Sequence, residues 1–115
     1  MTSRERQYLL DILLEAEDAL SFVHGKSFDD LCINAMLRKA VLHSLAILGE
    51  AAGRIDETTE TDVPNLPWRK MKNLRNVIVH DYEGVNLPLI WEVVTTELPA
   101  VVAVLDPLFP ERPKP

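Results

Sequence analysis

Apolar residues recur at helical spacing through most of this chain, and that periodicity constrains its fold more than any other feature. Four segments show it, and each is separated from the next by a short run rich in polar, glycine or proline residues. They cover about residues 3–24, 28–52, 67–82 and 87–105. Four amphipathic helices joined by short links favour an up-and-down bundle. The sequence therefore predicts an all-α fold, a four-helix bundle whose first two helices form an antiparallel hairpin.

Capping residues mark the boundaries of the first two helices. Thr2 and Ser27 each open a capping box, in which an acid lies three residues further on. Gly25 and Gly53 then end the same two helices. Residues 54–66 are polar and predict a connecting loop with room for one short helical turn.

The last helix contains two prolines in different settings. Asn86 is placed to cap this helix, and Pro88 lies in its first turn, where a proline removes no hydrogen bond. Pro99 does remove one, so we expect the helix to bend or break near it. The proline-rich segment 107–115 predicts an irregular or mobile tail. We therefore expect one domain, a bundle at 1–106 followed by a tail at 107–115.

The composition excludes several classes of protein and site. No run reaches the roughly 18 uninterrupted apolar residues of a membrane-spanning helix, and the first residues do not form a signal peptide. Cys32 is the only cysteine, which excludes an internal disulfide, and three dispersed histidines do not make a zinc site. We therefore expect a protein of the reducing cytoplasm that binds no membrane and needs no metal or cofactor.

Positive charge is scarce but concentrated. The net charge of −6 is unlike the large basic surface with which most nucleic-acid-binding proteins neutralise phosphate. The positive residues Arg69, Lys70, Lys72 and Arg75 nevertheless fall close together on the third helical segment. Any contact with RNA is expected there, and binding without a partner should be weak and sensitive to salt.

The same segment carries the densest group of chemically able side chains, Arg75, Asn76, His80, Asp81 and Tyr82. On a regular helix Arg75 and Tyr82 lie about 20° apart, whereas Arg75 and His80 lie about 140° apart. One straight helix therefore cannot easily direct both Arg75 and His80 at one phosphate. Either the helix loosens near His80, or a second copy of the chain completes the site. Helices this apolar in a small domain also favour a homodimer.

The spacing Arg75-x4-His80-x-Tyr82 matches the Arg-x4-His-x-Tyr motif of the HEPN superfamily. More closely, the chain resembles the HepT-like toxins that are paired with minimal nucleotidyltransferase (MNT) antitoxins. Further segments carry the resemblance in the same order: YLLDIL at 8–13, LGEAA at 48–52, LPW at 66–68 and IWEVV at 90–94. Together they span nearly the whole chain, which makes the resemblance far more specific than the motif alone.

The chemistry of these side chains suits cleavage of RNA. Histidine transfers protons well because its pKa is ordinarily near neutrality, and arginine offers phosphate a permanently charged planar fork. The resemblance implies a dimeric, metal-independent endoribonuclease in which Arg75 and His80 are catalytic. Asn76, Asp81 and Glu50 are candidates for supporting roles, Asn76 as a hydrogen-bond partner of the phosphate or of the His80 ring.

Tyr82 carries a second prediction. The family pattern implies that an MNT nucleotidyltransferase transfers AMP to this tyrosine, which would place negative charge and bulk beside Arg75 and His80. The alternative is a tyrosine that only caps the helix, with its hydroxyl bonded to the backbone. A rival for the whole chain is a non-catalytic helical module that is the binding partner or regulatory substrate of a nucleotidyltransferase. The acidic net charge favours this rival, and the intact motif favours the enzyme.

Overall fold

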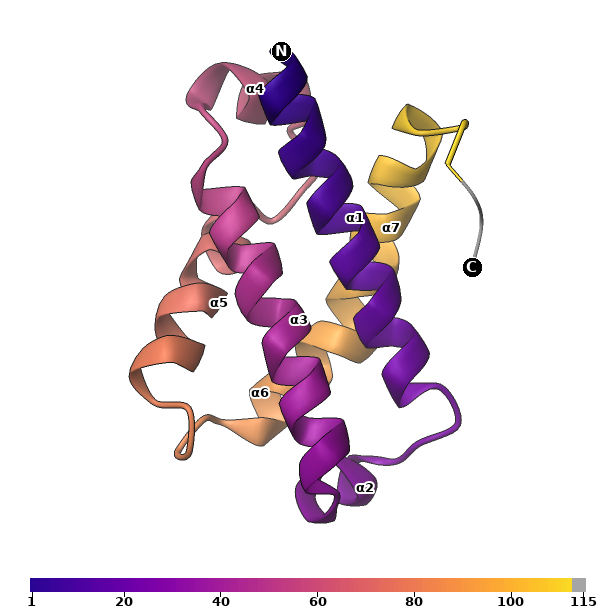
Figure 1. Cartoon of the computed structure of the whole chain (residues 1–115), viewed down its shortest axis with the longest axis vertical. Coiled ribbons are helices and arrows are strands. Elements are labelled where there is room, and N and C mark those ends of the chain that lie inside the picture. The colour runs from indigo at the N-terminus through magenta and orange to yellow at the C-terminus, as the bar shows by residue number, and fades with distance from the viewer. Residues whose placement is uncertain (113–115) are drawn as a thin grey trace.

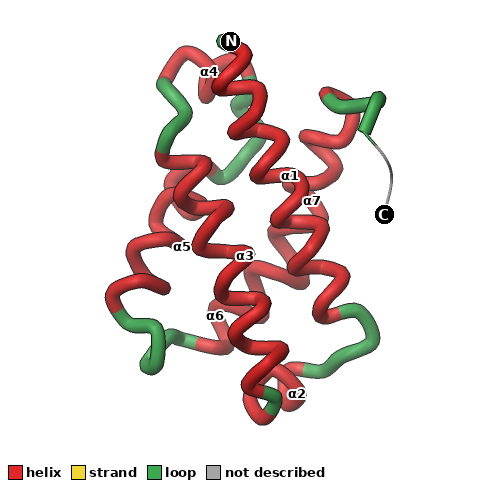
Figure 2. The backbone as a smooth tube through the Cα atoms, in the orientation of Figure 1, coloured by secondary structure: helices red, strands yellow, loops and turns green. Residues whose placement is uncertain are grey.

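The computed structural model describes residues 1–112, which fold into helices and connecting loops without a strand in that range (Figures 1 and 2). The two longest helices, α1 (Ser3–Val23) and α3 (Ala35–Gly53), run antiparallel and lie side by side. Helix α5 (Trp68–His80) packs on α3, and α7 (Leu98–Leu105) packs on α1. The predicted all-α class and the opening hairpin are therefore confirmed.

Helix α1 begins and ends within one residue of the predicted positions, with Thr2 as its cap. The Thr2 hydroxyl accepts the Glu5 N–H at 3.1 Å and donates to Glu5 Oε2 at 3.3 Å, and Gly25 ends the helix with a φ of +73°. Glu5 Oε1 in addition accepts the Asp56 N–H at 3.1 Å and the Thr59 hydroxyl at 2.8 Å. This buried contact ties the start of α1 to the short helix α4 (Glu57–Asp62).

The single helix predicted at 28–52 is wrong, because the chain breaks at Asn34 into α2 (Phe28–Ile33) and α3. The capping box at Ser27 is complete, with the Ser27 hydroxyl and the Asp30 carboxylate each accepting the other's N–H. Asn34 then leaves helical geometry (φ −98°, ψ 101°), and its Oδ1 accepts the Leu37 N–H at 3.0 Å. A short polar side chain that can bond its own backbone competes with the helix, and here it caps two helices at once.

Helix α5 is shorter than predicted at both ends. Pro67 precedes it rather than opening it, and the helix ends at His80 instead of residue 82. The Trp68 indole N–H donates to the Val63 carbonyl at 2.9 Å, which anchors the start of α5 to the preceding loop. Tyr82 consequently lies in the turn after the helix.

The C-terminal helical stretch accommodates Pro99 by widening rather than by breaking. Asn86 caps α6 (Leu87–Glu92) as predicted, with Oδ1 accepting the Leu89 N–H at 3.1 Å. A π-helical turn, η1 (Val93–Glu97), then connects α6 to α7, and the Leu98 N–H bonds to the Val93 carbonyl five residues back. Pro99 falls in the first turn of α7, where its missing N–H is tolerated.

The tail predicted from residue 107 is irregular beyond the 3₁₀ turn η2 (Asp106–Leu108), but through residue 112 it belongs to the packed domain. Phe109 is only 2% exposed, and the Arg6 guanidinium lies 4.4 Å from the centre of its ring. Buried Arg112 forms ion pairs with Glu17 at 2.9 Å and Asp106 at 2.6 Å. The aromatic ring and the paired arginine hold this segment against α1. The remainder of the predicted tail, 113–115, lies outside the described residues.

One stretch, Leu87–Leu108, is long and apolar enough to cross a membrane by length and composition, with a mean hydropathy of 1.6. Three acids, Glu92, Glu97 and Asp106, lie within it. Its residues Ile90, Val94 and Leu98 are at most 1% exposed and pack against the other helices. These residues form the buried face of the stretch, and 28% of its apolar window is buried in all.

Candidate functional site

Helices α3 and α5 touch backbone to backbone at Gly49. A Cβ atom at this position would lie 2.7 Å from the Arg75 nitrogen and 2.8 Å from the Met71 carbonyl oxygen. Cβ atoms essentially never come within 3.0 Å of such neighbours, so the crossing requires glycine. The close approach brings the next residue of α3, Glu50, alongside Arg75.

Glu50 joins two arginines on this surface. Its Oε2 lies 3.0 Å from Arg75 Nε, and its Oε1 lies 3.2 Å from Arg54 Nη2. Arg75 Nη1 also donates to Asn76 Oδ1 at 3.4 Å. Arg75 and Glu50 are each 45% exposed, so the ion pair orients the guanidinium while leaving it open to a ligand. With Lys72 these residues border a shallow hollow of about 410 Å³.

His80 is the last residue of α5, and its side chain is exposed. Within residues 1–112 it makes no hydrogen bond or ion pair that would fix the imidazole. The Asp81 N–H bonds to the Val77 carbonyl at 3.2 Å, so the helix stays regular through His80. The loosening considered from the sequence is therefore absent in this chain, and Arg75 and His80 remain about 140° apart around the helix axis.

A polar stripe along α5 leads toward His80. Its members lie three, four, seven or eight residues from one another, except for the neighbours Lys72 and Asn73, or eleven at its two ends, and so share one face of the helix: Arg69, Lys72, Asn73, Asn76 and His80. Beside it lies an open groove of about 700 Å³, bordered on the far side by Glu60 of α4. Asn76 belongs to both this stripe and the Arg75 hollow, and so connects the two candidate catalytic residues.

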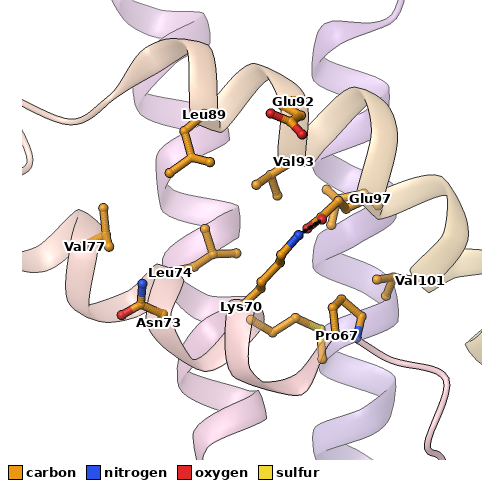
Figure 3. Close-up of a pocket in the computed structure, with 12 residues that line it drawn as sticks. Pro67, Lys70, Asn73, Leu74, Val77, Leu89, Glu92, Val93, Glu97 and Val101 are labelled. Carbon is orange, nitrogen blue, oxygen red and sulfur yellow. Dashed lines mark hydrogen bonds and ion pairs between the residues drawn. The ribbon is translucent and has the colours of Figure 1, made fainter.

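The predicted RNA-binding cations Arg69, Lys70 and Lys72 all line the groove along α5, but two of them are paired with acids. Lys72 pairs with Glu60, and Lys70 turns to the other side of α5, where its Nζ lies 2.6 Å from Glu97 Oε1. Figure 3 shows Lys70 reaching Glu97 across an apolar cleft of about 200 Å³ between α5 and the C-terminal helices. The hydrogen bond and charge of Glu97 raise the pKa of Lys70. Arg69 is left as the α5 cation that has no ion pair within residues 1–112.

Asp81 and Tyr82 lie in the turn that follows α5. The Asp81 carboxylate packs over Gly84, where a Cβ would stand 2.5 Å from Asp81 Oδ1, so it is engaged with this turn. Tyr82 is 42% exposed and borders a pocket formed with the start of α3. Tyr82 is therefore accessible, and it faces different neighbours from those of Arg75.

Comparison with known proteins adds an independent observation. A sequence model of the family described as "Ribonuclease HepT-like" matches residues 12–108. The chain belongs to the HepT-like ribonuclease family. The matched region contains the whole stripe, the Arg75 hollow and Tyr82, so the family assignment and the site geometry concern the same residues.

Several relatives resemble this HepT-like chain along most of their length. A protein of Methanocaldococcus jannaschii described as a "Putative RNase" is 34% identical over 102 residues, covering 88% of this chain and 94% of the relative. A second "Putative RNase" of the same organism is 34% identical, covering 82% and 78%. The "Probable ribonuclease HepT" of Thermococcus cleftensis is 30% identical, covering 88% and 92%. No solved structure matches the chain significantly.

Sequence reasoning named the candidate site residues but could not predict the contacts between helices that surround them. The pairs Glu50–Arg75, Lys72–Glu60 and Lys70–Glu97 join different helices, so helical spacing within one segment could not show them. Gly49 of the LGEAA segment did carry a signal of the crossing, since a glycine in the middle of a helix is unfavourable unless another backbone comes close. Among the described residues no cluster of three or more histidine, cysteine or acidic side chains could hold a metal ion.

Proposed function

We propose that this protein is a metal-independent endoribonuclease in which Arg75 and His80 act on the scissile phosphate. The observation that carries the proposal is the placement of both groups: an exposed arginine oriented by Glu50, and an exposed histidine at the end of the polar stripe on the same helix. Both are available to a ligand from solvent. Family membership supports RNA as the substrate.

The reaction follows from the two side chains. Neutral His80 accepts the proton of a ribose 2′-hydroxyl, whose oxygen attacks the adjacent phosphorus. The P–O5′ bond breaks, the proton passes from His80 to the departing 5′-oxygen, and a 2′,3′-cyclic phosphate and a 5′-hydroxyl result. The Arg75 fork binds the non-bridging oxygens, where negative charge builds up, and Asn76 is placed to donate a further hydrogen bond.

The site is completed by a homodimer in this proposal. Because α5 is regular through His80, one chain directs Arg75 and His80 to different sides of the helix. A second copy placed against the exposed face of α5 would set the Arg75 of one chain opposite the His80 of the other. The phosphodiester would then bind between the two copies.

The toxin–antitoxin role is the second part of the proposal. A cytoplasmic MNT-type nucleotidyltransferase would restrain the toxin by modifying Tyr82, whose phenol attacks the α-phosphate of ATP and releases pyrophosphate. The exposure of Tyr82, two residues beyond His80, supports this step. Intact-mass measurement after co-expression with the nucleotidyltransferase tests it, with Tyr82→Phe as the control. An unchanged mass of the wild-type chain would rule the modification out.

A non-catalytic helical module remains the second candidate, and one observation favours it. Three cations of α5 (Lys70, Lys72 and Arg75) are paired with glutamates, in a chain of net charge −6. RNA cleavage by the unmodified wild type and by His80→Ala, both in excess chelator, separates the two functions. The ribonuclease proposal expects cleavage by the wild type alone. Equal inactivity of both proteins would leave the binding module.

A further inference from the structure

A separate pocket of about 500 Å³ opens beside Tyr82. One wall is the start of α3, with Arg38, Lys39 and Leu42, and the other is the segment from Tyr82 to the beginning of α6. These two segments lie at the same end of the molecule (Figure 1). The pocket shares no residue with the hollow at Arg75 or with the groove along α5.

The two cations of this pocket, Arg38 and Lys39, have no carboxylate partner among residues 1–112. Lys39 is exposed and has no ion pair among residues 1–112, in contrast to Lys70 and Lys72, whose ammonium groups are occupied by carboxylates. Arg38 is held in place by one edge only, since its Nη1 donates to the Leu31 and Cys32 carbonyls at 3.3 and 2.9 Å. A pre-oriented guanidinium beside an unpaired ammonium group suits a phosphate.

The rest of the lining suits a nucleobase and a ribose. Leu42 and Val85 are 1% and 9% exposed and, with half-buried Leu87, form an apolar wall for the face of a ring. Glu83 supplies a carboxylate acceptor for an exocyclic amine or a ribose hydroxyl. The volume is within the range of pockets that bind small ligands.

We propose that this pocket binds a nucleoside monophosphate and that, in the modified protein, it holds the adenylate attached to Tyr82. The placement of the adenylate rests on the proposed function. The phosphate lies against Arg38 and Lys39, and the adenine lies against the apolar wall. The adenylate thereby ties the turn after α5 to α3 and fixes a negative charge two residues from His80. Inhibition then acts through His80 and its approach to RNA, while the Arg75 hollow stays empty of nucleotide.

Titration of free 5′-AMP into the unmodified protein, followed by NMR chemical shifts, tests the pocket without requiring any modification. We expect weak binding that perturbs Leu42, Val85 and Leu87. Lys39→Gln should weaken it about threefold to tenfold, because one charge-assisted contact is lost at an exposed position. Arg4→Gln makes the same charge change near the N-terminus, and the affinity for AMP should stay unchanged. Perturbations confined to Lys72, Arg75 and Asn76, or no binding, would overturn the proposal.

The same comparison of NMR chemical shifts, made on protein adenylated by co-expression, tests whether the pocket holds the adenylate on Tyr82. Shifts relative to the unmodified chain should cover Lys39, Leu42 and Val85, and Lys39→Gln should move the ³¹P resonance of the tyrosyl phosphodiester. If the shifts are centred on Arg75 and Asn76 instead, the adenylate lies at the proposed nuclease site, and its placement in the pocket is wrong. An unchanged intact mass would show that the modification of Tyr82 itself is wrong, which the titration with free AMP distinguishes from failure of the pocket.

Discussion

The Arg75 guanidinium is paired with the Glu50 carboxylate and the Asn76 amide, and this setting would govern RNA binding under the proposed function. The motif spacing predicted which arginine and histidine to consider, because it lies within one helix. It could not predict that Glu50 occupies the Nε edge of Arg75 and also holds Arg54. That contact depends on the crossing of α3 and α5. Under the proposed function, RNA would have to compete with a carboxylate for Arg75.

Replacing Glu50 by glutamine should tighten RNA binding, because it removes the negative charge that competes with phosphate for Arg75 and Arg54. In a His80→Ala background, which prevents cleavage, we expect severalfold tighter binding of single-stranded RNA at low salt. The dependence of log K on log salt should steepen by about 0.7 for each cation released. Fluorescence anisotropy across a salt series measures both quantities.

Glu57→Gln is the matched control, since this exposed acid of α4 forms no ion pair within residues 1–112. If it tightens binding as much as Glu50→Gln does, net charge alone explains the effect and the Glu50–Arg75 pair has no special role.

Helices were predicted where the apolar period was long, and their breaks were missed where a single side chain decided them. Asn34 divides one predicted helix into two because its amide caps the second. Pro99 is accommodated by a π-helical turn, although the sequence predicted only that some disruption occurs there. Phe109 is buried because it meets α1, a contact across almost the whole chain that local composition cannot show.

The Gly49 crossing gives a prediction about helix packing. Gly49→Ala places a methyl group against the backbone of α5, so the helices must separate, and we expect a loss of about 1–3 kcal/mol in unfolding free energy. Nuclease activity should fall as Arg75 moves from Glu50. Denaturant unfolding and RNA cleavage measure the two effects. Gly53→Ala is the control, because nothing lies within 4 Å of its added Cβ. Equal stability of the two variants would contradict the close crossing.

The contact between α1 and α4 gives a prediction about pH. The Asp56 N–H, and then the Thr59 hydroxyl, lower the pKa of Glu5 from 4.5 to about 2. Because the folded state binds this proton less readily than the unfolded state, Glu5 stabilises the fold above pH 4.5, and that contribution is lost as the pH falls toward 2. Glu5→Gln should lower stability at neutral pH and flatten its decline across that interval, as followed by thermal unfolding. A decline as steep as in the wild type would show that other carboxyl groups cause it.

At the level of the assembly, helical geometry predicted more than the fold of one chain. The separation of about 140° between Arg75 and His80 posed two alternatives, and because α5 ends regularly, the proposed function relies on a second copy to bring the two groups together. The mode of pairing could not be predicted, because it depends on how two surfaces fit. Sedimentation at micromolar concentration should show a dimer, whereas a monomer that still cleaves RNA would contradict the shared site.

Mixing two inactive variants tests the shared site most directly. Arg75→Ala and His80→Ala chains, unfolded together in equal amounts and refolded, form mixed dimers in which the intact arginine of one chain meets the intact histidine of the other. Random pairing makes half of the dimers mixed, each with one working site of two, so RNA cleavage should return to about a quarter of the wild-type rate. If the refolded mixture cleaves no faster than either variant alone, Arg75 and His80 do not act across two copies of this chain.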